Sequence, residues 1–207
     1  MNAGIRYLQI ETEVKDDPNT RQVAWFFTPD NGKDEWQFGR VNLKRGQPYK
    51  IVITAQRSNA LLGYVAVDDF EFEFNGEECT LMPESARPTT PTSTSPTTSV
   101  QQGTFPDCKF EHDTCGWFIN EFADMKWKIT NTEELAQSGE DSPKGDFDGN
   151  FIYVNAATGN LSSNTILATE MGENPVEGCL VFFFSLFVSL FCYKVGFHNY
   201  FYSMMEV

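Results

Sequence analysis

The sequence predicts an all-β fold, an antiparallel, jelly-roll-like β-sandwich. Short runs of apolar and β-branched residues recur along the chain, and several alternate with polar residues at the period of a half-buried strand. Gly, Pro, Asn and Asp separate these runs at intervals typical of turns between antiparallel strands. Hydrophobic residues make up 41% of the chain and aromatic residues 14%, which is enough to fill a core. Short strands and turns at this spacing favour a sandwich or a barrel.

Five strands are expected in the first part of the chain. Polar and apolar residues alternate over residues 7–12, before the polar turn sequence KDDPNT. Further strands are expected at residues 23–27, 41–43, 49–55 and 63–74. Each run is bounded by Gly, Pro or Asn, and no helical period of useful length is present. This part of the chain is therefore predicted to be β throughout.

A linker separates this first segment from the rest of the chain. Residues 88–99 read PTTPTSTSPTTS and contain only Pro, Ser and Thr, so they have no side chains suited to a core. Proline keeps such a stretch extended, and the hydroxyl groups suit O-glycosylation; the alternative is a plain flexible linker without sugar. We therefore divide the chain into a first segment (residues 1–84), a linker (85–104), a second segment (105–184) and a divergent apolar tail (185–207).

The second segment is also predicted to be β. Strands are expected at residues 126–130, 150–156 and 179–184, and residues 139–150 are expected to form a loop rich in carboxylates and glycine. The apolar run that includes the last of these strands ends at Lys194, which is short of the about 20 residues that a bilayer-spanning helix needs. Phe and Val favour strands. We therefore expect a core strand that runs into the tail, with a membrane segment as the alternative.

Composition excludes several classes of function. The formal net charge of −14 excludes nucleic acid as a partner, because phosphate backbones recruit basic stripes, and it disfavours direct attachment to anionic lipid. Two histidines and no CxxC pair argue against a zinc site, whereas acidic groups leave room for other divalent cations. The start MNAGIRYLQIETE lacks the apolar core of a signal peptide, so Met1 is not expected to be the natural start of a chain that otherwise looks secreted.

Cysteines, aromatic residues and acidic residues together carry a resemblance to a known family. In the second segment the pattern consists of Cys108-Lys109-Phe110-Glu111, Cys115-Gly116-Trp117, Trp127 after Glu121 and Asp124, the loop 141–149, the strand FIYVNA and the strand CLVFFF from Cys179. In the first segment it consists of Trp36, the strand YKIVITAQRS, residues 63–70 and Cys79. This order of residues resembles the MAM domain family, found in meprins, neuropilins and receptor-type tyrosine phosphatases.

The two segments match the family in an unusual order. The first resembles the C-terminal half of one MAM domain, and the second resembles the N-terminal half of another. Neither half should bury its sheet faces alone, but together they supply about one domain's strands in circularly permuted order. We therefore expect one permuted sandwich, with two separate half-modules as the alternative. The chain departs from the family at Lys109, where an acidic residue is usual, and beyond about residue 184, where the resemblance ends.

The resemblance also implies two disulfides. Cys108 would bond to Cys115, and Cys79 would bond to Cys179 across the sandwich. The second bond can form within this chain only if the two segments pack together, and closing so long a loop is worth about 4–5 kcal/mol in the chain-entropy model. Cys192 then remains as the odd thiol among the five cysteines.

Carboxylates are the candidate ligands for a metal. In similar jelly-roll folds, a carboxylate from the first strand and one from the last hold a structural Ca²⁺, which prefers oxygen ligands. The residues at such positions are Glu111 and Asp69, with Asp113 and Asp141 as weaker candidates. The alternative is that Asp68 and Asp69 hold the end of a strand by hydrogen bonds. No catalytic residues are expected, because hydrolysis by paired carboxylates needs a cleft and tuned protonation.

Tryptophans and one asparagine each have a second interpretation. The four tryptophans, Trp25, Trp36, Trp117 and Trp127, are expected in the core, with a carbohydrate-stacking platform as the alternative. Asn160-Leu161-Ser162 is the one N-glycosylation sequon in the sequence, and it marks Asn160 as the acceptor if the chain is secreted.

The resemblance implies a non-enzymatic module that acts in adhesion or recognition through protein–protein contacts, often homophilic. Its location would be extracellular or at the cell surface, with membrane attachment supplied by a parent protein rather than by this segment. One alternative is the non-catalytic MAM region of an ectoenzyme such as a meprin-like protease, for which an HExxH motif elsewhere on the parent chain would decide; none is present here. The other alternative is a lectin-like glycan-binding module.

Overall fold

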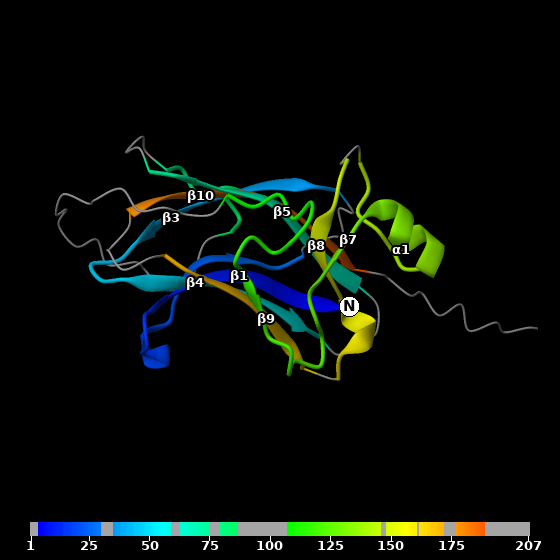
Figure 1. The fold of residues 1–207 in the computed structure, drawn as a ribbon, viewed down its shortest axis with the longest axis horizontal. Coiled ribbons are helices and arrows are strands. Elements are labelled where there is room, and N and C mark those ends of the chain that lie inside the picture. The colour runs from blue at the N-terminus through cyan, green and yellow to red at the C-terminus, as the bar shows by residue number, and fades with distance from the viewer. Residues whose placement is uncertain are drawn as a thin grey trace, which may run out of the picture.

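The computed structural model describes residues 4–29, 35–58, 63–74, 79–86, 107–145, 148–160, 162–171 and 177–188. These residues form two five-stranded sheets that pack as a β-sandwich (Figure 1). One sheet contains β1 (Ile5–Val14), β2 (Gln22–Phe27), β4 (Tyr49–Arg57), β6 (Phe118–Ile119) and β9 (Asn164–Glu170). The other contains β3 (Gln37–Lys44), β5 (Gly63–Glu73), β7 (Lys128–Thr130), β8 (Phe151–Asn155) and β10 (Glu177–Val188). The all-β sandwich predicted from the sequence is confirmed.

Each sheet contains strands from both segments. The order in the first sheet is β2-β1-β4-β9-β6, and the order in the second is β3-β10-β5-β8-β7, with antiparallel pairing throughout. Strand β10 of the second segment lies between β3 and β5 of the first segment and hydrogen-bonds to both. Strand β9 likewise pairs along β4. The two segments therefore form one sandwich rather than two half-modules.

Aromatic side chains fill the space between the sheets. Trp25 of β2 contacts Phe182 and Phe184 of β10 edge-on, with ring centroids 5.2 and 5.0 Å apart. Phe182 also contacts Phe70 of β5 at 5.8 Å, and the Phe70 ring stacks on Trp117 at 4.7 Å. All five side chains are buried. Because such pairs add about 0.5–1.5 kcal/mol each beyond the burial of their area, this chain of rings binds both sheets and both segments together.

Two contacts between glycine and phenylalanine flank β10. Phe182 lies opposite Gly39 of β3 in the register, and a Cβ atom at residue 39 would overlap the Phe182 ring. A Cβ atom at Gly178 of β10 would overlap the ring of Phe72 on β5. Each segment therefore provides a glycine that leaves room for a phenylalanine of the other segment.

A short helix, α1 (Thr132–Ser138), lies beside β7 and β8 (Figure 1). The side chain of Asn131 caps its start by accepting a hydrogen bond from the Glu134 N–H at 2.9 Å, and Gly139 ends it in the left-handed conformation. Its Leu135 belongs to a second apolar cluster with Tyr64, Ala66, Phe151 and Tyr153. The sequence analysis did not predict this helix, although the Asn-x-x-Glu spacing and the following glycine are typical cap signals. Seven residues are too few to show a helical period.

Two strands were also missing from the sequence prediction. Strand β9 places Thr165, Leu167 and Thr169 on its buried side, so polar residues occupy two of its three inward positions. Strand β6 has only two residues and lies at the edge of the first sheet, where it pairs with β9. Neither strand has a strong hydrophobic pattern in its own sequence. Each forms by pairing with a neighbouring strand.

The sandwich extends past two of the boundaries assigned from sequence. Strand β10 continues to Val188, and Leu186 is buried in the core, so the sandwich includes residues that were assigned to the tail. Ala86, assigned to the linker, is buried and accepts a hydrogen bond from the Phe26 N–H at 3.3 Å. Among the residues described, no helix has the length and apolarity needed to span a membrane. The rest of the linker and tail, including Cys192, lies outside the described residues.

Candidate functional site

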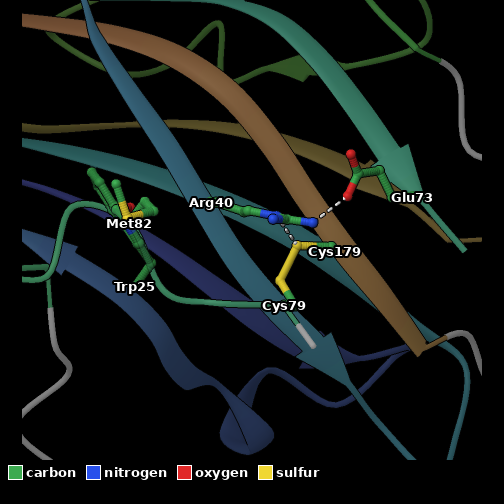
Figure 2. The surroundings of a disulfide bond; sticks show 6 residues. All are labelled: Trp25, Arg40, Glu73, Cys79, Met82 and Cys179. Atoms are coloured by element: carbon green, nitrogen blue, oxygen red, sulfur yellow. Dashed lines mark hydrogen bonds and ion pairs between the residues drawn. A yellow bond between two sulfur atoms is a disulfide. The ribbon is translucent and has the colours of Figure 1, made fainter. Parts of the chain in front are cut away.

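A disulfide between Cys79 and Cys179 joins the two segments near the start of β10 (Figure 2). The two Cα atoms lie 5.7 Å apart, within the usual range for a disulfide, although 100 positions separate the residues. Cys179 lies opposite Asn42 of β3 and opposite Glu73 of β5, so strands of the first segment hold it on both sides. The insertion of β10 between these strands is what brings the two cysteines together.

An arginine contacts this disulfide. The Nε of Arg40 lies 3.0 Å from the Sγ of Cys179, and its Nη2 donates to Oε2 of Glu73 at 2.7 Å. The backbones of Arg40 and Met82 exchange two hydrogen bonds, and the Met82 carbonyl accepts from Trp25 Nε1 at 2.8 Å. Figure 2 shows these residues grouped around β3 and the disulfide. The sequence analysis missed Arg40, because its partners lie 33 and 139 positions away along the chain.

The second disulfide, between Cys108 and Cys115, closes a short turn with its Cα atoms 5.6 Å apart. The backbone of Cys108 exchanges two hydrogen bonds of 2.8 Å with that of Phe70 on β5. The carboxylate of Asp113 accepts from the Cys115 N–H at 2.7 Å within the turn. These contacts hold the turn against β5, close to the paired aspartates of that strand.

Asp68 is a buried carboxylate on β5, with 2% of its surface exposed. Its Oδ1 accepts from the Asp69 N–H at 2.7 Å, and Asp69 has a φ of 51° where the pairing with β10 shifts register. Burial raises the pKa of Asp68 to about 8; the Asp69 N–H lowers it, the charges of Asp69 and Glu111 raise it, and the charge of Lys109 lowers it. A carboxyl group with this pKa is protonated at neutral pH.

Glu111 is positioned by the loop before β8. Its Oε2 accepts from the Asn150 N–H at 3.2 Å, and its carbonyl accepts from Asn150 Nδ2 at 2.7 Å. Gly149 has a φ of 102°, and a Cβ atom there would overlap the Glu111 carboxylate. Both features explain why glycine precedes Asn150. The loop thus holds the Glu111 carboxylate where its charge raises the pKa of Asp68.

One of the weaker calcium candidates has another local role, because the side chain of Asp113 caps the disulfide turn. At Asp141, the backbone carbonyl accepts a 3.0 Å hydrogen bond from the Tyr153 hydroxyl, which does not engage the carboxylate. Within the described parts of the chain, no group of three or more His, Cys, Asp or Glu residues could hold a metal ion.

A lysine also competes for one of the main calcium candidates. Nζ of Lys109 lies 4.0 Å from Oδ1 of Asp69, where the resemblance leads one to expect an acidic neighbour. A positive charge there weakens the attraction of Asp69 for a cation. The calcium hypothesis stays a prediction, whereas the 2.7 Å bond between Asp68 and Asp69 is the kind of contact that its alternative requires.

The sequon residue Asn160 lies beside the turn that follows β6. Its Nδ2 donates to Oδ2 of Asp124 at 3.1 Å, and the Ser163 hydroxyl donates to the same oxygen at 3.0 Å. Asn160 and Ser162 are exposed, and Leu161 lies outside the described residues. The side chain that would accept a sugar is therefore at the surface and held in place by Asp124.

Among the described residues, the large aromatic side chains that face solvent are phenylalanines and not the tryptophans. Trp25, Trp117 and Trp127 are buried and Trp36 is half-buried, which agrees with the core role predicted for them. Phe118 on β6 is 68% exposed and Phe122 is 99% exposed. The sequence analysis did not single out either residue, because only the tertiary structure shows which aromatic side chains lie outside the core.

Comparison with known proteins agrees with this arrangement. The family model of the MAM domain, meprin/A5/mu, matches residues 2–80 and 108–194. The two matched ranges correspond to the segments whose strands interleave, and they leave the linker between them unmatched. No solved structure matches the chain. The interleaved sandwich, the disulfide between the segments and the matched ranges lead to one conclusion: the chain belongs to the MAM domain family.

Proposed function

We propose that this chain is a non-enzymatic recognition module that acts in cell adhesion through protein–protein contacts. The MAM family is an extracellular, adhesion-type and non-catalytic module family, and membership of it is the observation that carries the proposal. The two disulfides fit an oxidising, extracellular location. Attachment to a membrane would be supplied by a parent protein.

The acidic charge of the chain distinguishes two kinds of partner. With a formal net charge of −14, two copies of the chain repel each other at long range. A homophilic contact should therefore strengthen as salt screens this repulsion, over a Debye length of about 8 Å at physiological ionic strength. A contact with a basic partner should instead weaken as salt is added. Salt dependence thus reports the class of partner.

Adhesion can be tested with the secreted full chain coupled to fluorescent beads of two colours. Coated beads of both colours should cluster together if the contact is homophilic, and more strongly at 300 mM than at 50 mM salt. Clustering only with cells, and less of it at high salt, would indicate a heterophilic basic partner. Beads coated with an unrelated protein of similar negative charge serve as the control. If the coated beads bind neither each other nor cells, the adhesion proposal is wrong.

The two alternatives give different results in the same assay. A lectin-like module should lose its binding when the glycans of the partner surface are removed enzymatically, and it should select particular sugars on a glycan array. The non-catalytic region of an ectoenzyme should bind the protease part of its parent chain and leave free beads dispersed. Binding that survives deglycosylation of the partner supports protein–protein recognition.

A further inference from the structure

We propose that Phe122 is a packing platform for the glycan attached to Asn160, so that the protein's own sugar covers an exposed aromatic ring. The ligand is the N-acetylglucosamine core of an N-linked glycan. The proposal rests on the extracellular location in the proposed function, because such glycans are added to secreted and cell-surface proteins.

Phe122 is held in solvent by a structured turn. The Asn120 carbonyl accepts from the Ala123 N–H at 3.2 Å, and the Asn120 side chain accepts from the Phe122 N–H at 3.1 Å. The Asn120 N–H donates to the Ile166 carbonyl of β9 at 3.2 Å, which anchors the turn to the first sheet. Phe122 is 99% exposed, the highest value among the large apolar side chains that the structure describes. The anchored turn therefore holds the bare ring in solvent, where covering it would remove apolar surface from water.

The loop that carries the sequon packs directly against this turn. Asp124, two residues after Phe122, accepts hydrogen bonds from the side chains of both Asn160 and Ser163. A Cβ atom at Gly159, the residue before the sequon, would overlap the side chain of Met125, which is fully buried. The absence of a side chain at residue 159 is therefore what lets the two loops lie in contact.

This geometry places the first sugar beside the turn. Glycosylation replaces one of the two hydrogens on Nδ2 with C1 of the sugar; the lipid diphosphate of the donor leaves, and the proton is lost to solvent. The remaining N–H can still donate to Asp124, whose oxygen lies 3.1 Å away. Consecutive Cα atoms are about 3.8 Å apart, so the Phe122 Cα lies within about 8 Å of the Cα of Asp124, the residue that holds the Asn160 side chain. The C–H face of the sugar is apolar, and covering the ring with it removes apolar surface from water.

Protein partners are the competing occupants, and the arrangement favours the glycan. A protein that docked on Phe122 would also have to accommodate any sugar on Asn160, because Asp124 holds that side chain against the same turn. The glycan needs no further partner, because it is tethered at the site. Covalent attachment replaces the cost of association with a high local concentration.

A thermodynamic cycle on the full chain, secreted from mammalian cells behind an added signal peptide, tests the proposal. Mass spectrometry first establishes whether Asn160 carries a glycan. Melting temperatures are then compared for four proteins: the natural sequence, Ser162→Ala to remove the sequon, Phe122→Ala, and the double variant. Asn160→Gln repeats the sequon removal by a different change, in case Ser162→Ala perturbs its loop. Phe38→Ala is the matched control, because Phe38 is also exposed but lies on β3 in the opposite sheet.

We expect removal of the glycan to lower the melting temperature by about 2–4 °C when Phe122 is present. The same removal should have less than half this effect in the Phe122→Ala background and its full effect in the Phe38→Ala background. An occupied Asn160 whose removal has equal effects in all backgrounds would overturn the platform and leave the extracellular location standing. A secreted chain with an unoccupied Asn160 would overturn it as well. A glycosylated chain that binds neither copies of itself nor cells would contradict the proposed function and leave this inference standing.

Discussion

Phe182 of β10 lies across from Gly39 of β3, and its ring occupies the space that a side chain at residue 39 would need. Phe182 belongs to the second segment, is completely buried and also contacts Trp25 and Phe70 of the first segment. Gly39 is thus the point at which the first segment makes room for a core residue of the second. A change at residue 39 should disturb the packing between the segments while leaving each segment's own sequence pattern intact.

We expect Gly39→Ala to destabilise the chain by about 1–3 kcal/mol, because overpacking a filled core forces the backbone or the Phe182 ring to move. Gly46→Ala is the matched control, since a Cβ atom at Gly46 meets nothing within 4 Å. Urea unfolding followed by tryptophan fluorescence measures the difference. Equal unfolding midpoints for the two variants would mean that β10 does not occupy this place in solution.

The two disulfides should differ in their effects on stability. Cys79→Ser opens a link across 100 residues, whose closure is worth about 4–5 kcal/mol in the chain-entropy model. Cys108→Ser opens a link across only 7 residues, worth about 2–3 kcal/mol in the same model. Denaturant unfolding under oxidising conditions should therefore show the larger loss for Cys79→Ser, and reductant should bring both variants and the parent chain together. A larger loss for Cys108→Ser would contradict the predicted order.

Asp68 should make the chain less stable as the pH rises from about 4 to about 8. Its folded pKa of about 8 lies above the ordinary value, so the folded state keeps a proton that the unfolded state has released. Stability then falls by up to about 1.4 kcal/mol per pH unit across this window and levels off above it. Asp68→Asn cannot lose a proton, and its side-chain oxygen can still accept from the Asp69 N–H. Between pH 5 and pH 8, in chelator, the free energy of unfolding should decline less for Asp68→Asn than for the parent. Equal declines in the two proteins would mean that Asp68 is not the source of the pH dependence.

Glu13 should have the opposite pH dependence and provides an internal control. Burial raises its pKa, but hydrogen bonds from Arg21 and Lys50 outweigh this effect and leave the pKa below its ordinary value. A carboxylate of this kind stabilises the fold above its unfolded pKa and loses that contribution as the pH falls. Glu13→Gln should therefore be less stable than the parent at neutral pH, with the difference shrinking below about pH 4. A difference that grows in acid would contradict this assignment.

Calcium should stabilise the chain only weakly, because Lys109 places a positive charge 4.0 Å from Asp69. With a dissociation constant near 1 mM, typical of weak extracellular sites, 5 mM Ca²⁺ would add about 1 kcal/mol. Lys109→Gln should increase the shift in melting temperature between Ca²⁺ and chelator, and Glu111→Gln should remove it. If chelator leaves the melting temperature of both the parent and Lys109→Gln unchanged, the calcium hypothesis should be dropped.

Local sequence patterns predicted most of the strands correctly, and the reason is visible in particular residues. The alternation around Ile10 and the run around Val52 and Val67 each specify a strand with a buried face, without reference to the rest of the chain. Strand β9 escaped prediction because two of its buried positions, Thr165 and Thr169, are polar, so its sequence shows no apolar alternation. Helix α1 escaped because its caps act over a single turn, too short a distance for periodicity to show.

The sequence by itself determined the fold class, the two segments, the family resemblance and the cysteine pairs which that resemblance implies. These depend on composition, on short-range pattern and on the order of particular residues. The tertiary structure decided that β10 enters between β3 and β5, that Arg40 contacts Cys179, that Asp68 is buried where the charge of Glu111 acts on it, that Phe122 stands in solvent, and that Asn160 donates to Asp124. Each of these depends on contacts between residues far apart in the chain, and such contacts come from packing that no local pattern records.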